Sequence, residues 1–147
     1  MELFDLLPVA AIVNGKYLSL HGGICPQLSS LQKLNEFNRR GEPMSEGMLS
    51  DLLWADPADE DEKDEFEFWN NRSRGTSYIF GQEPLKKLLK QSNLQALIRA
   101  HEAKPDGYEF HMPRSDGQPL CITVFSAPNY CGSYGNRAAV FCTAADR

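Results

Sequence analysis

The sequence predicts a mixed α and β fold, because strand patterns and helix patterns alternate along its 147 residues. Two short apolar runs, 10–13 and 17–20, flank Asn14-Gly15, a pair that favours a tight hairpin turn. A leucine stripe in the middle of the chain has helical spacing, and turn formers separate two apolar runs near its end. These three patterns predict one domain in which β-hairpins accompany short helices.

The first expected elements surround the hairpin. The second strand, 17–20, delivers His21 into Gly22-Gly23, where the missing side chains allow a sharp turn and a close approach to a ligand. A short helix is expected to follow, capped by Ser29 or Ser30 and continuing through Phe37.

The middle of the chain predicts a helix and a buried segment. Pro84 is expected to open the helix, with Leu85, Leu88 and Leu89 on one face. Residues 94–100 read as a buried apolar segment that leads directly to His101.

The last third predicts a second hairpin. Apolar runs at 108–112 and 120–125 flank the turn formers of 113–119. A final strand is expected at 138–143.

The formal net charge of −5 is concentrated between Asp56 and Glu67, where eight acids accompany Lys63 alone. Outside this stretch there are 12 acids and 14 bases, a mildly basic balance that suits an anionic substrate. We expect the acidic stretch to be a solvated loop. A calcium site or a basic partner is the alternative, although the acids lack the spacing and central glycine of a calcium loop.

The sequence contains no obvious membrane or secretion signal. No apolar run approaches the roughly 18 residues of a membrane helix, and the first residues lack the basic end of a signal peptide. A cytoplasmic or nuclear protein is expected, with neither membrane nor nucleic acid as a partner. Free thiols are expected, because no CxxC spacing occurs among the four cysteines, Cys25, Cys121, Cys131 and Cys142.

Two histidines are candidates for metal binding. His21 and His101 each follow an apolar strand, and a neutral imidazole at a strand end can bind a transition metal. From the residues alone, a structural or exposed histidine remains the alternative at both positions. His111 lies in a strand beside a turn and is expected at the surface.

Four runs, 19–26, 52–57, 73–78 and 124–132, resemble the second half of a phosphoprotein phosphatase catalytic core. The resemblance implies a partial metallophosphatase β-sandwich with flanking helices, in which residues 1–147 are the C-terminal half of the catalytic domain and the N-terminal half is missing. Within that family, 99–103 and 106–108 are most similar to the calcineurin catalytic subunit, whereas 130–132 resembles the type-one branch.

The resemblance implies two divalent or trivalent metal ions, Mn, Fe or Zn, in the whole enzyme. His21 and His101 match two ligands of the second metal. The family supplies its other ligands from Asp-x-His, Gly-Asp-x-x-Asp-Arg-Gly and Gly-Asn-His-Glu motifs, none of which occurs in this chain. The metal site of this chain alone is therefore expected to be incomplete.

The resemblance also assigns residues to substrate. Arg74 matches the arginine that binds the phosphate, and Tyr130 matches the tyrosine of the same pocket, which makes both candidates for catalysis and substrate binding. Arg72 competes with Arg74 for that role. Trp54 is either a core aromatic or a groove residue that contacts substrate, and Cys131 is either a reactive thiol or an inert cysteine.

The expected function is therefore part of a serine/threonine protein phosphatase that hydrolyses phosphoserine and phosphothreonine monoesters by attack of a metal-activated water. The chain alone is expected to be inactive, and a non-catalytic phosphatase-like binding module is the alternative. Expected partners are a phosphoprotein substrate, the missing N-terminal half and a regulatory subunit.

Overall fold

In the computed structural model of the chain, residues 3–59 and 67–144 are described. Five strands form the larger sheet in the order β1-β2-β6-β8-β7. Their bounds are β1 (Ala10–Val13), β2 (Tyr17–Leu20), β6 (Ala96–Arg99), β7 (Tyr108–Pro113) and β8 (Pro119–Val124).

A smaller sheet and short helices complete the fold. The smaller sheet has the order β3-β5-β4, formed by β3 (Asp56–Pro57), β4 (Phe68–Asn70) and β5 (Tyr78–Phe80). The α-helices are α1 (Met48–Trp54) and α2 (Gln82–Gln91), and 3₁₀ turns lie at η1 (Phe4–Leu6), η2 (Leu31–Asn35) and η3 (Tyr130–Gly132). The sequence pattern did not predict α1 or the three short strands of the smaller sheet.

The first hairpin has the predicted turn. Asn14 and Gly15 both take positive φ, 52° and 62°, and the Lys16 amide donates to the Val13 carbonyl at 3.0 Å. β1 and β2 then pair antiparallel from Val13 opposite Tyr17 to Ala10 opposite Leu20.

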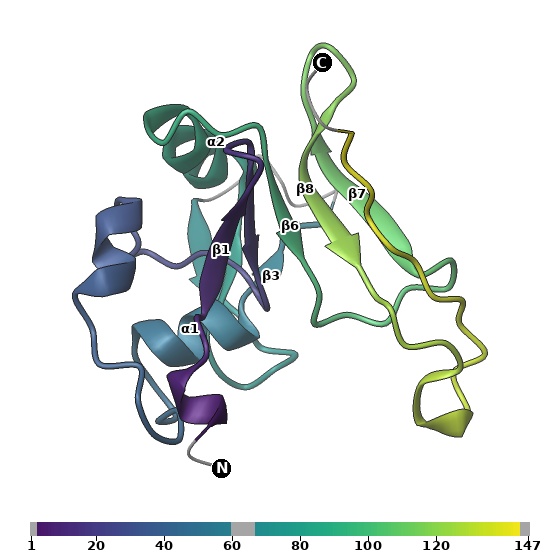
Figure 1. Ribbon diagram of the computed structural model, residues 1–147, viewed down its shortest axis with the longest axis horizontal. Coiled ribbons are helices and arrows are strands. Elements are labelled where there is room, and N and C mark those ends of the chain that lie inside the picture. Colours follow the sequence, from purple (N-terminus) through teal and green to yellow (C-terminus); the bar gives the residue numbers. More distant parts are fainter. Residues whose placement is uncertain (1–2, 60–66, 145–147) are drawn as a thin grey trace.

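The centre of the larger sheet is parallel. β2 pairs with β6 and β6 with β8, both in parallel, while β1 and β7 join as antiparallel edge strands. The carboxyl ends of the three central strands therefore lie along one edge of the sheet. Figure 1 shows α1, α2 and β3 grouped near β1 and β6, with the C-terminal segment running beside β7 and β8.

The predicted leucine stripe packs α2 into the core. Leu85, Leu88 and Leu89 are all buried, as expected. The helix begins at Gln82 rather than at Pro84, which occupies the first turn, where an amide would have no partner within the helix.

Two predicted elements are wrong. Residues 138–143 form no strand; their segment is held by single bonds, such as the Ala139 amide donating to the Phe125 carbonyl at 3.1 Å. The predicted helix through Phe37 is only the 3₁₀ turn of Leu31–Asn35, and Ser30 precedes it without a side-chain capping bond.

The acidic stretch is only partly a solvated loop. Asp59 and Glu67 are exposed, but Asp56 is 8% exposed and makes ion pairs, so its assignment to the loop is wrong. The prediction of a solvated loop at 60–66 lies outside the described residues.

Gly22 and Gly23 are explained by close packing against the protein itself. A Cβ on Gly22 would lie 2.6 Å from the carbonyl carbon of Leu53, and one on Gly23 would lie 2.2 Å from the ring of Phe80. The Gly22 amide also donates to the Leu52 carbonyl at 2.9 Å. These contacts press the segment after β2 against the end of α1.

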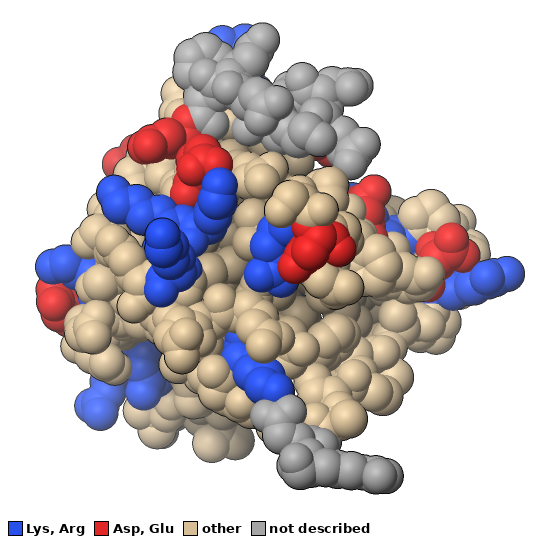
Figure 2. All heavy atoms as spheres, turned by 90° about the horizontal axis from the view of Figure 1, so that it is seen from above, with Lys and Arg blue, Asp and Glu red and all other residues tan. Residues whose placement is uncertain are grey.

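The surface carries its charges in small mixed groups on the face seen in Figure 2, which looks down on the end of the molecule where α2 and the β7–β8 turn lie. Lys86 pairs with Glu83 on α2 at 3.1 Å, and Arg114 lies 3.9 Å from Asp116 in that turn. Within the described part of the chain, every helix is too short or too polar to cross a membrane.

Gly22→Ala is expected to lower the free energy of unfolding by about 3 kcal/mol, because rigid backbone must move to admit the methyl group. Gly117→Ala is the control, since nothing lies within 4 Å of its added Cβ. Its positive φ alone should cost about 1 kcal/mol. Urea denaturation measures both, and equal losses would contradict the packing explanation.

Candidate active site

Three site segments follow the three parallel strands. His21 follows β2, His101 lies two residues after β6, and Phe125 follows β8 and begins the segment that leads to Tyr130. Because these strand ends share one edge, the topology itself brings the segments together. An open cavity of about 730 Å³ lies at this edge.

The two candidate histidines are in contact. His21 Nε2 and His101 Nδ1 lie 3.1 Å apart, and the ring centroids are 4.9 Å apart. His101 takes a left-handed backbone conformation, with φ 64°, which turns its side chain out of the strand direction. The other ring nitrogen of His101, Nε2, is buried with no hydrogen-bond partner among the described residues.

Both imidazoles are held neutral. Burial and then the nearby charge of Arg74 lower the pKa of His101 to about 4, with Arg99 and His21 adding to the effect and Asp56 opposing it. Burial, Arg99 and Arg74 also lower the pKa of His21. The neutral form is the one that binds metal ions, so the site favours ligation over protonation.

Arg74 is anchored by Asp56. Its Nε donates to Asp56 Oδ2 at 2.8 Å and its Nη2 lies 3.4 Å from Oδ1, which leaves Nη1 outside this pairing. Burial alone would raise the pKa of Asp56, but hydrogen bonds from Arg74 and Asn71, together with the charges of Arg99 and Arg74, hold that pKa below its usual range. The hydrogen bond to Asp56 in turn raises the pKa of Arg74.

Sequence reasoning missed Arg99, which lies at the centre of the site. It is 1% exposed, although it sits in a segment that reads as apolar. All five guanidinium protons have acceptors. Nε donates to the Gly22 carbonyl at 2.7 Å, Nη2 to the Ala55 carbonyl at 3.2 Å and Asp56 Oδ1 at 2.8 Å, and Nη1 to Glu102 Oε2 at 2.5 Å and Thr123 Oγ1 at 3.4 Å.

Aromatic side chains line the cavity. Trp54 at the end of α1 is 42% exposed and meets the His101 ring edge-on, with centroids 5.2 Å apart. Tyr130 is 44% exposed and contacts the rings of Phe125 and Tyr134. Of the two readings of Trp54, the geometry therefore fits a cavity residue rather than a core aromatic.

Asn136, which sequence reasoning also missed, braces the segment that carries Tyr130. It is 7% exposed, its Oδ1 accepts from the Tyr130 amide at 2.9 Å, and its Nδ2 donates to the carbonyls of Ala127 and Arg137, each at 2.8 Å. The sequence offered no signal for this role, because a loop asparagine is usual in turns.

The structure thus brings five of the predicted site residues to one cavity, namely His21, Trp54, Arg74, His101 and Tyr130. Cys131 is exposed, next to Tyr130 but outside the cavity lining. Arg72 is exposed and lines a different cavity, so of the two arginines Arg74 is the one at this cavity.

The surface placement of His111 is wrong. This residue is 6% exposed, and its Nε2 lies 2.9 Å from Thr123 Oγ1. Its neighbour Met112 is buried as well, so this part of β7 is covered on both faces, where the sequence showed only a polar residue near a turn.

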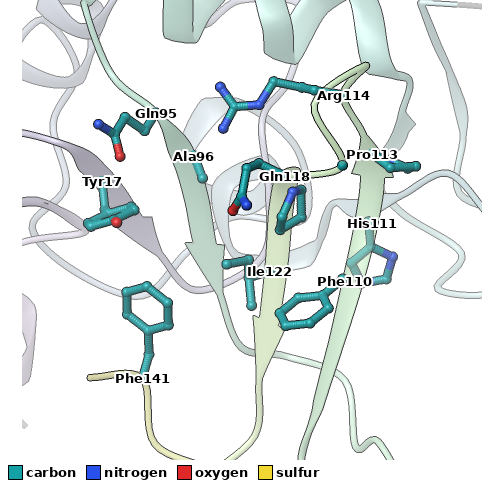
Figure 3. Close-up of a pocket in the computed structure, with 12 residues that line it drawn as sticks. Tyr17, Gln95, Ala96, Phe110, His111, Pro113, Arg114, Gln118, Ile122 and Phe141 are labelled. Atoms are coloured by element: carbon teal, nitrogen blue, oxygen red, sulfur yellow. The ribbon is translucent and has the colours of Figure 1, made fainter. Parts of the chain in front are cut away.

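A second cavity of about 510 Å³, shown in Figure 3, lies between the β7–β8 turn and the start of β6. Tyr17, Phe110 and Phe141 surround it, with Arg114 at one end. It contains none of the predicted site residues, and the candidate site is therefore the cavity at the carboxyl ends of the strands.

Within 3–59 and 67–144, no group of three or more His, Cys, Asp or Glu side chains could hold a metal ion. His21 and His101 form a pair only. Two nitrogens bound to the same metal at about 2.1 Å each lie about 3 Å apart when their bonds are near right angles, and the observed 3.1 Å fits that arrangement.

The sequence pattern of the calcineurin-like phosphoesterases (Metallophos) matches residues 1–105. His21, Arg74 and His101 lie within the matched residues, and Tyr130 lies beyond them.

Two curated relatives come from Saccharomyces cerevisiae. The chain is 44% identical to serine/threonine-protein phosphatase 2B catalytic subunit A1 and 41% identical to subunit A2, over 93% and 95% of its own length. It spans only 27% and 28% of the lengths of these relatives.

A solved structure of a protein serine/threonine phosphatase from Saccharomyces cerevisiae, described as similar to human phosphatase PP5, superposes with a TM-score of 0.72. It is 32% identical, and the match covers 92% of this chain and 39% of that one. These similarities confirm the predicted resemblance and the mixed α and β metallophosphatase fold.

Both imidazoles are expected to titrate below the ordinary value of 6.5, His101 near 4, because burial and two guanidinium charges oppose protonation. The unfolded chain then binds more protons than the folded one between about pH 4 and 6.5, so these groups lower the free energy of unfolding as pH falls through that window. Proton NMR of the two ring signals measures the midpoints. Midpoints at or above 6.5 would contradict the electrostatic account.

Thiol labelling is expected to modify Cys131 and Cys142 quickly and the other two cysteines only after unfolding. Burial, with the charge of Asp51, raises the pKa of Cys25 to about 11, and burial raises that of Cys121 to about 12, whereas the reactive form is the thiolate. Titration with a disulfide reagent counts the accessible thiols, and Cys131→Ser should remove one. Rapid labelling of Cys25 or Cys121 in native protein would be evidence against the predicted burial.

Proposed function

This chain belongs to the calcineurin-like phosphoesterase family, and on that premise we propose that it is part of a serine/threonine protein phosphatase. The proposed reaction is hydrolysis of phosphoserine and phosphothreonine monoesters. The observation that carries it is the convergence of His21, Arg74 and His101 at one cavity edge, with aromatic side chains around them.

His21 and His101 are proposed as metal ligands, through the two nitrogens that face each other at 3.1 Å. Their neutral form and the separation of these two nitrogens fit that role. Two ions of Mn, Fe or Zn in the whole enzyme would supply an activated water and neutralise phosphoryl charge. Further ligands would come from the rest of the catalytic domain, because two protein ligands do not complete such a site.

Arg74 is proposed to bind the phosphate of the substrate. Asp56 occupies its Nε and Nη2 side, so a phosphate oxygen would meet Nη1 and the remaining proton of Nη2. The ion pair with Asp56 fixes the orientation of the Arg74 guanidinium before substrate binds, which lowers the entropic cost of ordering that side chain on binding. The planar guanidinium can bind two oxygens together, a geometry that lysine cannot reproduce.

Trp54 and Tyr130 are proposed to contact the substrate beside the phosphate. Both are more than two-fifths exposed while lining the cavity, which leaves aromatic surface available to a peptide. The Tyr130 hydroxyl is also proposed to donate to a phosphate oxygen. Cys131, next to it, is proposed as an accessible thiol at the rim.

The chain spans only 27% and 28% of the lengths of its relatives, so the preceding half of the catalytic domain is a proposed partner. A phosphoprotein substrate and a regulatory subunit are proposed as the other partners. We place residues 1–147 in the C-terminal half of that domain, and the protein in the cytoplasm or nucleus.

One observation favours a second function. Because the described residues hold no complete metal cluster, the cavity can also serve a module that binds phosphorylated or inhibitory peptides without hydrolysis. In that case Trp54 and Tyr130 would provide the binding surface.

The test is hydrolysis of p-nitrophenyl phosphate with manganese, by the chain alone and after addition of the preceding segment of the Saccharomyces cerevisiae 2B subunit A1. The chain alone should be inactive and the combination active. Arg74→Lys should lower kcat/KM of the combination roughly 100-fold, because one arm of the phosphate contact is lost. Arg72→Lys is the matched control and should change it less than twofold, since Arg72 lines another cavity.

Equal activity of the two arginine variants would refute the role of Arg74. An inactive combination that still binds a phosphopeptide, with binding that survives Arg74→Ala, would favour the binding module instead. Turnover by the isolated chain would overturn the proposal that it needs a preceding half.

A further inference from the structure

His111 is a buried polar side chain outside the catalytic cavity. It makes two polar contacts through one nitrogen, because Nε2 lies 2.9 Å from Thr123 Oγ1 and 3.6 Å from Glu109 Oε2. A buried polar group costs free energy unless it is paired, and an apolar residue would fill the same space at lower cost. The residues that contact His111 therefore indicate its role in the structure.

Both contacts lead to the same atom, Nη1 of Arg99. On the first path, Thr123 Oγ1 accepts from Nη1 at 3.4 Å. On the second, Lys104 bridges the carboxylate of Glu109 to Glu102 Oε1, which it meets at 3.3 Å, and Glu102 Oε2 accepts from Nη1 at 2.5 Å. The 3.6 Å contact with Glu109 is too long for a hydrogen bond, so Thr123 is the hydrogen-bonded link from His111 to Arg99.

The protons along the path from His111 through Thr123 to Arg99 can all be placed. Burial lowers the pKa of His111, against the opposing charge of Glu109, so the imidazole is neutral near pH 7. Thr123 Oγ1 accepts from Arg99, which leaves its own proton free to be donated to the His111 nitrogen. The Thr123 hydroxyl is thereby fixed in the orientation that receives Arg99.

Arg99 links this path to the carboxylate of Glu102. Glu102 lines the cavity together with Arg74, and its negative charge acts on that guanidinium. Arg99 and Lys104 hold both of its oxygens. A released carboxylate would compete with phosphate for Arg74, because both anions bind the same planar fork.

We propose that His111 is a positioning residue, which acts through Thr123 and Arg99 to keep Glu102 on Arg99 and away from Arg74. This inference rests on the proposed function, in which Arg74 binds phosphate. His111 itself touches no substrate; it preserves the free side of the Arg74 guanidinium.

The test uses the full chain and inorganic phosphate, followed through the Nε–Hε NMR signals of Arg74 and Arg99. His111→Leu should shift the Arg99 signal and weaken phosphate binding at Arg74 about three- to tenfold, the effect of losing one hydrogen bond. Thr123→Val should do the same. His111→Gln and Thr123→Ser keep a hydrogen-bonding group and should remain near wild type.

Two further variants sharpen the test. Phe110→Leu is the control, because Phe110 is the adjacent residue of β7, 61% exposed, and Figure 3 shows its ring turned toward Ile122 on the open face of the sheet. Its phosphate affinity should equal that of wild type. In a Glu102→Gln background, His111→Leu should have no further effect on phosphate affinity, because the competing charge is gone.

An unchanged Arg99 signal in His111→Leu would overturn the inference. So would a loss of affinity that persists in full with Glu102→Gln, since His111 would then act only on general stability. Absence of any phosphate-induced change at Arg74 in wild type would overturn it as well. If phosphate binds as expected but the completed enzyme does not hydrolyse esters, the proposed function fails and the positioning role stands.

Discussion

The buried guanidinium of Arg99 is the constraint on which the site depends. A charged side chain that is only 1% exposed is tolerated when each of its N–H groups has an acceptor. Arg99 meets that condition, because five acceptor atoms surround its guanidinium. Those acceptors come from the segment after β2, the end of α1, β3, the segment after β6, and β8. One side chain thereby ties together the pieces of backbone that carry His21, Trp54 and His101. Removing a single acceptor would leave part of the charge unpaired, so the geometry of these segments is coupled.

The same charge sets the protonation of the histidines. Arg99 and Arg74 add to burial in disfavouring the imidazolium form of both rings. Asp56 neutralises the two guanidinium groups from one side while remaining ionised itself. One cavity is therefore lined by a charged guanidinium, that of Arg74, and by two neutral imidazoles.

Patterns within a short stretch of sequence predicted most of the elements around the site. The Asn14-Gly15 turn, the leucine face of α2 and the second hairpin each follow from residues that lie close together in the chain, and all three are present. His21 and His101 were also identified from local pattern, as residues that follow strands. Arg99 could not be, because its ion pair with Asp56 joins residues 43 positions apart and its segment reads as apolar. The same holds for His111, which contacts Thr123 on the neighbouring strand, and for Asp56, whose acidic neighbours suggested a solvated loop. The strand predicted at 138–143 failed for a related reason, since an apolar run forms a strand only where a neighbouring strand offers it a full ladder.

Because β2, β6 and β8 are parallel, the connections at the two ends of these strands differ in how well they can accept inserted residues. At the histidine edge, the pairing of Ser19 with Ile98 aligns the ends of β2 and β6, and a shift of one residue would change the positions at which His21 and His101 leave the sheet. At the other edge lie the Asn14–Lys16 turn and the turn between β7 and β8, which contribute nothing to the cavity. Insertions accumulated over evolution should therefore be found in those two turns, and engineered tags or loops are best placed there.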